Sequence, residues 1–329
     1  MAKNSVTKAI LLVGGKGTRL APLTDSTPKP MLKVAGKPVT EHQIVKAREA
    51  GITDLVLATS YLAEVFEPYF GDGSKFGISI TYAVEKEPLG TGGAIANAAA
   101  HLNLAEDESL VIFNGDVLSG HDLSAQIALH QQKSADVTLY LTRVDDPRAY
   151  GCVPLSPEGR VLGFLEKMEN PIADTINAGC YIFNARALAT IPRDTVVSVE
   201  RETFPQLLAD DSLLFGYSDG KYWIDMGTPH SFIKASRDLI LNPEISSATT
   251  LTAAEFFAEI DASIDSSAVV GGGSAIANRV SIGPGAKVMG SIISNDVAIS
   301  EGAEIIDSYI ASGITIPAAS KISGQILAH

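Results

Sequence analysis

The sequence lacks the features that would place the protein in a membrane or in an oxidising compartment. Among its 329 residues, no apolar run approaches the ~20 residues of a membrane-spanning helix, and the polar start lacks the apolar segment of a signal peptide. The two cysteines, Cys152 and Cys180, are far apart and show no C-x-x-C spacing, so we expect core residues and neither a disulfide framework nor a zinc site. These absences predict a cytoplasmic protein.

Positive charge is also scarce. The 25 lysines and arginines face 38 acidic residues, and the net charge of −13 excludes the broad basic face that binds nucleic-acid polymers or anionic membranes. The six histidines show no metal-ligand spacing and are interpreted as surface or structural residues. If the substrates are phosphates, the few cations beside them matter, which directs attention to Lys16, Arg19, Lys29 and Lys167.

The chain divides into two parts with different periodicity. Residues 1–242 alternate β-rich runs at 9–13, 54–59, 78–84 and 109–114 with helical stretches at 40–51 and 92–102, where Thr40 is a candidate N-cap and Gly51 a stop. This order predicts an α/β domain with a Rossmann-like, mostly parallel sheet. Ligands bind such sheets beyond the carboxyl ends of the strands, where the glycine-rich loop after the first strand lies.

The C-terminal part has a repeat of its own. Isoleucine or valine recurs in steps of six, six and five residues, at Ile276, Ile282, Val288, Ile293, Ile299, Ile305, Ile310, Ile316 and Ile322. This rhythm predicts about three coils of a hexapeptide-repeat parallel β-helix over residues 266–329, after a linker at 243–265. Its repeat core contains no histidine, so we do not expect a second catalytic site there. The flat face of such a coil suits contact between subunits, and we expect it to join the subunits of a homo-oligomer.

The loop "LLVGGKGTRLAPLTDSTPKP", residues 11–30, fits neither common phosphate motif. Lys16 is followed by glycine, against the Walker pattern, and Leu20 stands where the dinucleotide fingerprint needs its third glycine. Its glycines would still let backbone N–H groups approach phosphate oxygens, Arg19 can bridge two oxygens, and Lys29 is held between two prolines. The loop therefore predicts a site for a triphosphate.

Seven motifs occur in a fixed order: "GGKGTRLAPLTDSTPKPM", "EPLGTGGA", "FNGDVL", "YGCV", "FLEK", "NAGCYIF" and "WIDMGTP". Together they resemble the sugar-1-phosphate nucleotidyltransferase family, which commonly appends a left-handed β-helix. The resemblance implies direct in-line attack of a sugar phosphate on the α-phosphorus of a nucleoside triphosphate. The implied reaction transfers GMP from GTP to mannose 1-phosphate and gives GDP-mannose and pyrophosphate. Alternatives are a heptose-1-phosphate guanylyltransferase, a glucose-1-phosphate uridylyltransferase and a non-catalytic regulatory subunit.

The resemblance also implies a role for each motif. Arg19 and Lys29 would act on the triphosphate and the departing pyrophosphate, and Asp116 and Asp225 would share a Mg²⁺ ion, a hard cation that suits carboxylates. The residues expected to bind the nucleotide are Gly14, Gly15, Gly17, Thr18, Arg19, Glu85, Gly90 and Thr91. The residues expected to bind the sugar phosphate are Gly151, Glu166, Lys167 and Asn177.

The side chain of Glu85 favours one nucleobase over the others. A carboxylate has only acceptors, which suits the N1–H and amino donors of guanine better than a uracil or thymine edge. The alternative is that Glu85 is exposed and that the backbone around Gly90 and Thr91 reads the base. The segment "SVERETFP", residues 198–205, resembles the guanylyltransferase pattern but has no chemical role that its residues reveal; its acids would orient the Asp225 region or cap a helix.

Overall fold

The computed structural model describes residues 6–25, 27–60, 62–165, 169–249, 252 and 254–328. The chain forms two compact units. Unit 1 comprises Met1–Gly15, Gln43–Val117 and His121–Trp223, and unit 2 comprises Lys16–His42, Leu118–Gly120 and Ile224–His329. The chain passes between them after Gly15 and Gly120 and within α1 (Val39–Glu49), β7 (Val117–Ser119) and β11 (Trp223–Asp225).

Unit 1 is built on a seven-stranded sheet in the order β10-β8-β9-β6-β1-β4-β5. Neighbours pair in parallel except for β9, which runs antiparallel to both β6 and β8. The strands are β1 (Lys8–Leu12), β4 (Asp54–Thr59), β5 (Ser79–Val84), β6 (Ser109–Asn114), β8 (Val137–Arg143), β9 (Thr175–Asn184) and β10 (Leu214–Tyr217). The predicted mostly parallel sheet is confirmed.

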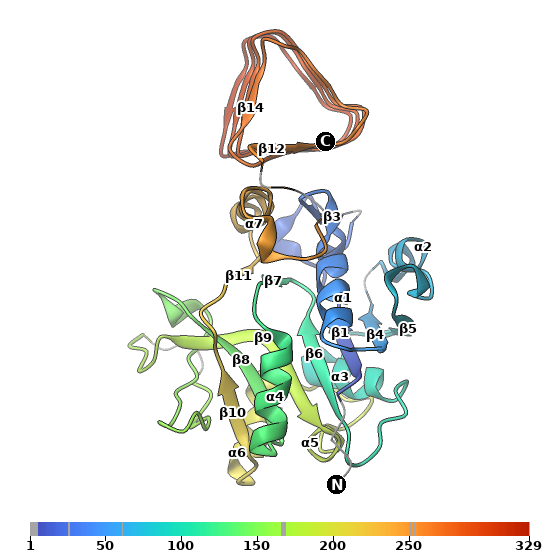
Figure 1. Ribbon diagram of the computed structural model, residues 1–329, viewed down its shortest axis with the longest axis vertical. Helices are drawn as coiled ribbons and strands as arrows, with labels where there is room; N and C mark the ends of the chain where they lie inside the picture. Colours follow the sequence, from blue (N-terminus) through green and yellow to red (C-terminus); the bar gives the residue numbers. More distant parts are fainter. Residues whose placement is uncertain are drawn as a thin grey trace. The chain divides into compact units, whose positions relative to one another are not determined.

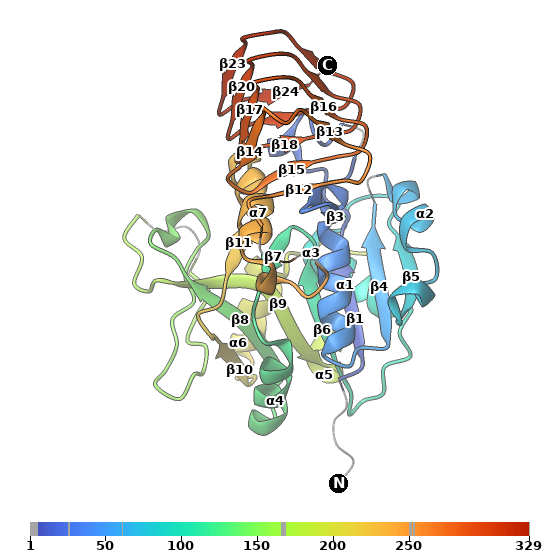
Figure 2. The same cartoon turned by 45° about the horizontal axis from the view of Figure 1, so that its top comes forward.

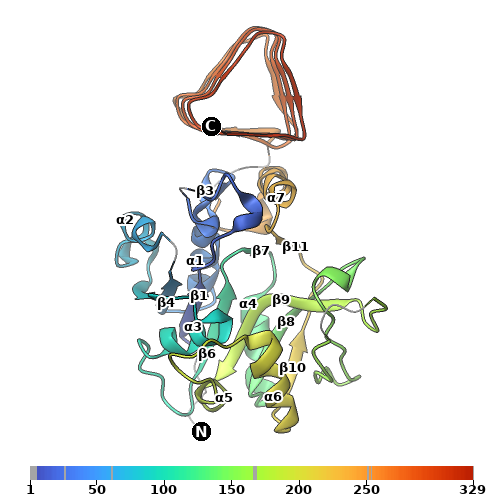
Figure 3. The ribbon, with the colours of Figure 1, turned by 180° about the vertical axis from the view of Figure 1, so that it is seen from behind.

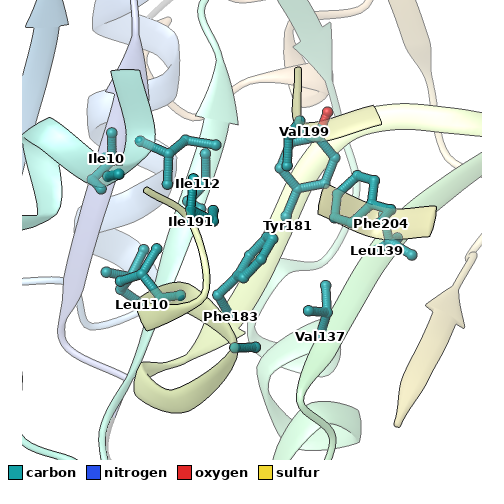
Figure 4. Close-up of a cluster of buried hydrophobic side chains, with 14 of the residues drawn as sticks. Ile10, Leu110, Ile112, Val137, Leu139, Tyr181, Phe183, Ile191, Val199 and Phe204 are labelled. Atoms are coloured by element: carbon teal, nitrogen blue, oxygen red, sulfur yellow. The ribbon is translucent and has the colours of Figure 1, made fainter. Parts of the chain in front are cut away.

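Helices cover both faces of this sheet. Helix α4 (Leu123–Lys133) lies over one face (Figure 1), and α3 (Gly90–Ala99), α5 (Ala185–Ala189) and α6 (Phe204–Ala209) lie over the other (Figure 3). The core between the sheet and the second group of helices is apolar (Figure 4). Strands that are buried on both faces are typically rich in Val, Ile and Leu, and this sheet follows that rule. The shorter helical elements are α2 (Glu67–Phe70), η3 (Ala63–Val65), η4 (Ser74–Phe76), η5 (Pro147–Ala149) and the π-helix η6 (Val199–Thr203).

Unit 2 combines the segment after the glycine-rich loop with the C-terminal part of the chain. Its first segment contains η1 (Thr18–Leu20), η2 (Lys29–Met31) and the hairpin β2 (Lys33–Val34) and β3 (Lys37–Pro38). Helix α7 (Pro229–Leu241) starts at a capping box formed by Thr228 and Ser231, and η7 (Pro243–Ile245) follows it.

The C-terminal strands form a short left-handed β-helix with a triangular cross-section (Figure 1), and its coils are stacked in parallel (Figure 2). All nine residues of the repeat are buried in its interior, so the predicted rhythm is confirmed. Each of its three faces is a parallel sheet. The first is β12 (Phe256–Ala258), β15 (Ser274–Ile276), β18 (Ile292–Ile293), β21 (Tyr309–Ile310) and β24 (Ile326–Leu327); the second is β13 (Ser263–Ile264), β16 (Ser281–Ile282), β19 (Ala298–Ile299) and β22 (Thr315–Ile316); the third is β14 (Val269–Gly271), β17 (Lys287–Met289), β20 (Glu304–Ile306) and β23 (Lys321–Ser323).

Buried serines line one corner of the β-helix. The backbone N–H of Ser291 donates to Oγ of Ser274 over 3.2 Å, that of Ser308 to Ser291 over 3.1 Å, and that of Gln325 to Ser308 over 3.1 Å. Each link spans 17 residues. We call this column the serine ladder; it satisfies buried backbone donors that the turn would otherwise leave unpaired.

Two expectations need adjustment. The strands of the β-helix begin at Phe256, inside the segment 243–265 that was expected to be a linker. The step from Ile264 to Ile282 is 18 residues, and the first coil has Ala258 where the next coil has Ile276, so the first coil does not follow the 17-residue pattern. Thr40 is not an N-cap: it lies within α1 and its hydroxyl donates to the carbonyl of Pro30. No helix among the described residues is long and apolar enough to span a membrane.

Candidate active site

The loop after β1 begins in unit 1 with two glycines in different surroundings. The carbonyl of Gly14 accepts a hydrogen bond from the hydroxyl of Ser60 over 2.6 Å, and a Cβ atom on Gly14 would lie 2.6 Å from that Oγ. A Cβ atom on Gly15 would meet no heavy atom within 4 Å. Close packing therefore requires glycine at position 14, whereas the backbone at Gly15 is open to an approaching ligand.

In unit 2, the rest of the loop places one cation beside a carboxylate and a second beside a glycine two residues further along the chain. Lys29 in η2 is only 7% exposed, and its Nζ lies 3.6 Å from Oδ1 of Asp225. The guanidinium of Arg19 covers Gly227, where a Cβ atom would lie 3.0 Å from Nη2. Unit 2 thus unites Arg19, Lys29 and Asp225, an arrangement that can neutralise a polyphosphate next to an acid.

Gly17 supports this cluster. Its φ of 62° is left-handed, and a Cβ atom there would lie 3.0 Å from both the Lys29 and the Thr24 side chains. Thr24 also donates its hydroxyl to the Gly17 carbonyl over 3.0 Å. The glycine therefore lets the loop close against the stem of Lys29, while Thr18 and Arg19, at the start of η1, stay exposed.

In unit 1, Asp116 follows β6 on a turn that the protein holds from two sides. The N–H of Gly115 donates to the carbonyl of Leu12 over 2.9 Å, and a Cβ atom on Gly115 would lie 2.4 Å from that oxygen. The side-chain amide of Gln43 donates to the carbonyls of Asn114 and Val117, over 2.7 and 2.9 Å. Asp116 is thus carried between two anchored carbonyls, and Gln43 is a supporting residue that the sequence motifs did not reveal.

Glu85 follows β5 and faces a cavity. Its Oε1 atom is buried and has no hydrogen-bond partner among the described residues, and burial raises the pKa of the Glu85 carboxyl. The cavity has a volume of about 250 Å³ and is also lined by Asn97, His101 and Arg193. An acceptor without a partner at the wall of a cavity is suited to a ligand that brings a donor.

Helix α3 begins at Gly90 in the motif "EPLGTGG". Gly90 has a φ of 71°, and a Cβ atom there would lie 2.6 Å from the carbonyl of Val197. The N–H of Gly92 donates to the same carbonyl over 2.8 Å. Glycines at this helix start therefore allow contact with the segment before η6, and Thr91, between them, lies at the positive end of the helix dipole.

Two of the expected sugar-binding residues, Gly151 and Asn177, are each next in sequence to a residue that contacts Trp223. Asn177 in β9 donates to the hydroxyl of Tyr181 over 2.8 Å, and Gly151, with a φ of 80°, closes the turn after η5. Trp223 donates its indole N–H to the carbonyl of Ala178 over 3.0 Å, and its ring lies 5.7 Å from that of Tyr150. The tryptophan therefore connects the two motifs. Glu166 and Lys167 lie outside the described residues.

A family model described as "Nucleotidyl transferase" matches residues 8–241. The chain belongs to the nucleotidyl transferase family. This nucleotidyltransferase is 49% identical over 283 residues to a Mycobacterium tuberculosis protein named mannose-1-phosphate guanylyltransferase. The matched region covers 86% of this chain and 78% of that protein. It is 36% identical to mannose-1-phosphate guanylyltransferase 1 of Arabidopsis thaliana, over 85% of this chain and 78% of that one.

Solved structures agree with the fold of this nucleotidyltransferase. The crystal structure of HddC from Yersinia pseudotuberculosis is similar with a TM-score of 0.61 and 26% identity, over 71% of this chain and all of that one. HddC has also been solved in complex with GMP-PN, and that structure has a TM-score of 0.59 and 26% identity.

The acids of this nucleotidyltransferase suit a hard cation that the substrates help to hold. No group of three or more His, Cys, Asp or Glu residues that could bind a metal occurs in the described part of the chain. Asp116 and Asp225 are partly exposed carboxylates, one in each unit. Mg²⁺ is usually bound by one or two carboxylates together with water and phosphate oxygens, so each of these carboxylates is of a kind that fits it.

Proposed function

We propose that this nucleotidyltransferase transfers GMP from GTP to mannose 1-phosphate and releases GDP-mannose and pyrophosphate. The name of the Mycobacterium tuberculosis relative supports the sugar. The observation that carries the choice of base is Glu85, whose buried Oε1 lacks a partner among the described residues. Guanine offers N1–H and an amino group to such an acceptor, and the GMP-PN complex of HddC supports the same base.

In the proposed mechanism, the phosphate oxygen of the sugar attacks the α-phosphorus in line with the departing pyrophosphate. Arg19, beside Gly227, and Lys29, beside Asp225, neutralise the triphosphate and then the pyrophosphate. Asp116 and Asp225 would hold Mg²⁺, which supplies charge neutralisation between the reacting phosphates when bound. No covalent intermediate is required, because alignment of the two anions supplies most of the rate.

The sugar phosphate is proposed to bind at Gly151 and Asn177, with Glu166 accepting from its hydroxyls and Lys167 holding its phosphate. The structure supports the first pair through the Trp223 and Tyr150 connection described above. We further propose a cytoplasmic homo-oligomer assembled through the β-helix. Each of its three sheets ends in an edge strand of the last coil, β22, β23 or β24, and such edges are usually covered.

The test is pyrophosphate release by the purified protein with Mg²⁺. GTP and UTP are each combined with mannose 1-phosphate, glucose 1-phosphate and a heptose 1-phosphate. Turnover restricted to GTP with mannose 1-phosphate is expected. Preference for another pair would replace the proposed substrates, and nucleotide binding without turnover of any pair would favour a regulatory subunit. Sedimentation of the same sample tests the homo-oligomer, which a monomer would exclude.

A further inference from the structure

The segment "SVERETFP" contains a carboxylate that accepts hydrogen bonds from three hydroxyl groups. Glu200 lies in η6, after the N-cap Ser198. Its Oε2 accepts from Oγ1 of Thr91 over 3.0 Å and from Oγ of Ser198 over 3.2 Å, and its Oε1 accepts from the hydroxyl of Tyr181 over 3.3 Å. Two of these donors lie about 110 and 20 residues away in the chain, in motifs proposed to serve different substrates.

On the nucleotide side, Glu200 fixes the hydroxyl of Thr91. That hydroxyl has one proton, which it gives to Glu200, and its oxygen accepts from the N–H of Val199 over 2.9 Å. The backbone of the same segment clamps the start of α3, because the N–H of Val197 also donates to the carbonyl of Leu89 over 2.9 Å. The Thr91 side chain is therefore committed to η6, and its contribution to a nucleotide would come from its backbone.

On the sugar side, Tyr181 links Glu200 to Asn177 by hydrogen bonds. The residue is fully buried, and its ring packs beside Val199 and Phe204 (Figure 4). Its hydroxyl gives its proton to Glu200, so it can only accept from the side-chain amides of Asn177 and Asn114, over 2.8 and 3.3 Å. Burial holds the pKa of Tyr181 well above its usual value, which keeps that proton in place.

This chain of donors sets the orientation of Asn177. Its Nδ2 points to Tyr181, and its Oδ1 accepts from the N–H of Gly179 over 3.1 Å. One N–H and one lone pair of the amide remain for a ligand, and the hydrogen bonds to Tyr181 and Gly179 fix their direction. Asn114, which precedes the turn of Asp116, is tied to the same hydroxyl.

We propose that Glu200 is a positioning residue that orients both substrate pockets at once, through Thr91 towards the nucleotide and through Tyr181 and Asn177 towards the sugar phosphate. This inference rests on the proposed function, which assigns those pockets. A carboxylate is required because all three hydroxyl groups donate to it. A glutamine would replace one acceptor by an NH₂ group and would force a hydroxyl to reverse its direction.

The test compares Glu200→Gln with Glu202→Gln. Glu202 lies in the same π-helix, is exposed and accepts from the backbone N–H of Ser198, so this control removes the same charge without touching either pocket. We measure KM for GTP, KM for mannose 1-phosphate, kcat and Tm. For Glu200→Gln, both KM values should rise about tenfold, as expected for a lost hydrogen bond to a charged group, whereas Glu202→Gln should leave both within about twofold.

Two further variants divide the effect. Thr91→Val should raise KM mainly for GTP, and Tyr181→Phe mainly for mannose 1-phosphate, since each removes one branch and keeps the shape of the side chain. In the Glu200→Gln background, neither should have a further effect, because the partner is already lost. A purely structural role would lower Tm and leave this selectivity absent.

The outcomes separate this inference from the proposed function. A wild-type protein that turns over a different pair refutes the proposed substrates, and the same variants are then measured with that pair. Wild-type KM values in Glu200→Gln overturn the positioning role. If Glu200→Gln does not fold, the selectivity of Thr91→Val and Tyr181→Phe decides: separate effects on the two KM values support the role, and equal effects on both overturn it.

Discussion

Gln43 holds the turn that carries Asp116, and replacing it with leucine tests how much of the activity depends on that support. The side chain is buried and donates both amide hydrogens, to the carbonyls of Asn114 and Val117. Leucine places an apolar side chain of similar size at that position and removes both donors. The two carbonyls then lose their partner next to the proposed catalytic acid.

The magnitude follows from counting buried polar groups. Each carbonyl left without a partner costs about 1–3 kcal/mol. The substitution also removes Oε1 of Gln43, which is buried without a partner among the described residues, and so recovers a similar amount for one group. The free energy of unfolding should fall by about 1–3 kcal/mol, which corresponds to roughly 2–10 °C in Tm. Because a displacement of about 1 Å in an active site costs up to ~100-fold, kcat should fall about 10- to 100-fold.

Gln126 provides the matched control. It is also a buried glutamine on a helix, α4, and it donates to the carbonyls of Thr138 and Cys180, over 3.2 and 3.4 Å. Gln126→Leu should lower Tm at least as much, because its Oε1 also accepts from Sγ of Cys180, and should leave kcat near the wild-type value. The assays are thermal unfolding and pyrophosphate release at saturating substrates. Equal losses of kcat in both variants, or an unchanged kcat in Gln43→Leu, would refute the supporting role of Gln43.

Three other predictions can be tested with the same assays. Asp116→Asn should abolish turnover with Mg²⁺ and leave Tm within a few degrees; wholesale unfolding would show a structural role instead. Glu85→Gln should weaken GTP relative to UTP, because it replaces one acceptor with a donor, and an unchanged preference in KM would remove the argument about the base. Burial lowers the pKa of both His42 and His130 to about 4, so below pH 6.5 the unfolded chain binds protons that the folded protein does not. Urea unfolding should therefore show full stability above pH 6.5 and a loss of up to about 3 kcal/mol per histidine by pH 4, and a flat profile between pH 7 and 4.5 would contradict this.

The predictable part of the fold is the part with a local repeat. The alternation of apolar runs located β1, β4, β5 and β6, and the recurring isoleucines located the β-helix, since each pattern lies within a few residues of sequence. Strand β9 runs antiparallel between two parallel groups, which depends on pairing with distant strands and leaves no local trace. The first coil escaped for a related reason, because its longer step and its alanine break the pattern.

The motifs located residues of the site but not what supports them. Arg19 and Lys29 were expected to act on one triphosphate; in unit 2, Lys29 lies 3.6 Å from Asp225 and Arg19 covers Gly227. Gln43 reaches carbonyls more than 70 residues away, and Glu200 reaches Thr91 109 residues away. Such contacts depend on how layers of the fold meet, and a single sequence carries no periodicity that reports them. The sequence contains only a weak indication of the role of Glu200, since "SVERETFP" contains more acidic residues than the cap of one helix needs.

The serine ladder has a consequence for how the tail of this protein can change length. Each serine receives the backbone of the coil that follows it, so every coil depends on its neighbour at a spacing of 17 residues. Removing or inserting one whole block of that size would keep both the hydroxyl contacts and the interior isoleucines in register. One extra residue within a strand would turn the side chains that follow it in that strand to the other face, whereas the 18-residue step from Ile264 to Ile282 shows that a coil can hold an extra residue and stay paired with its neighbour. Evolution of the tail is therefore expected to proceed by duplication and loss of complete coils, with point insertions confined to the corners.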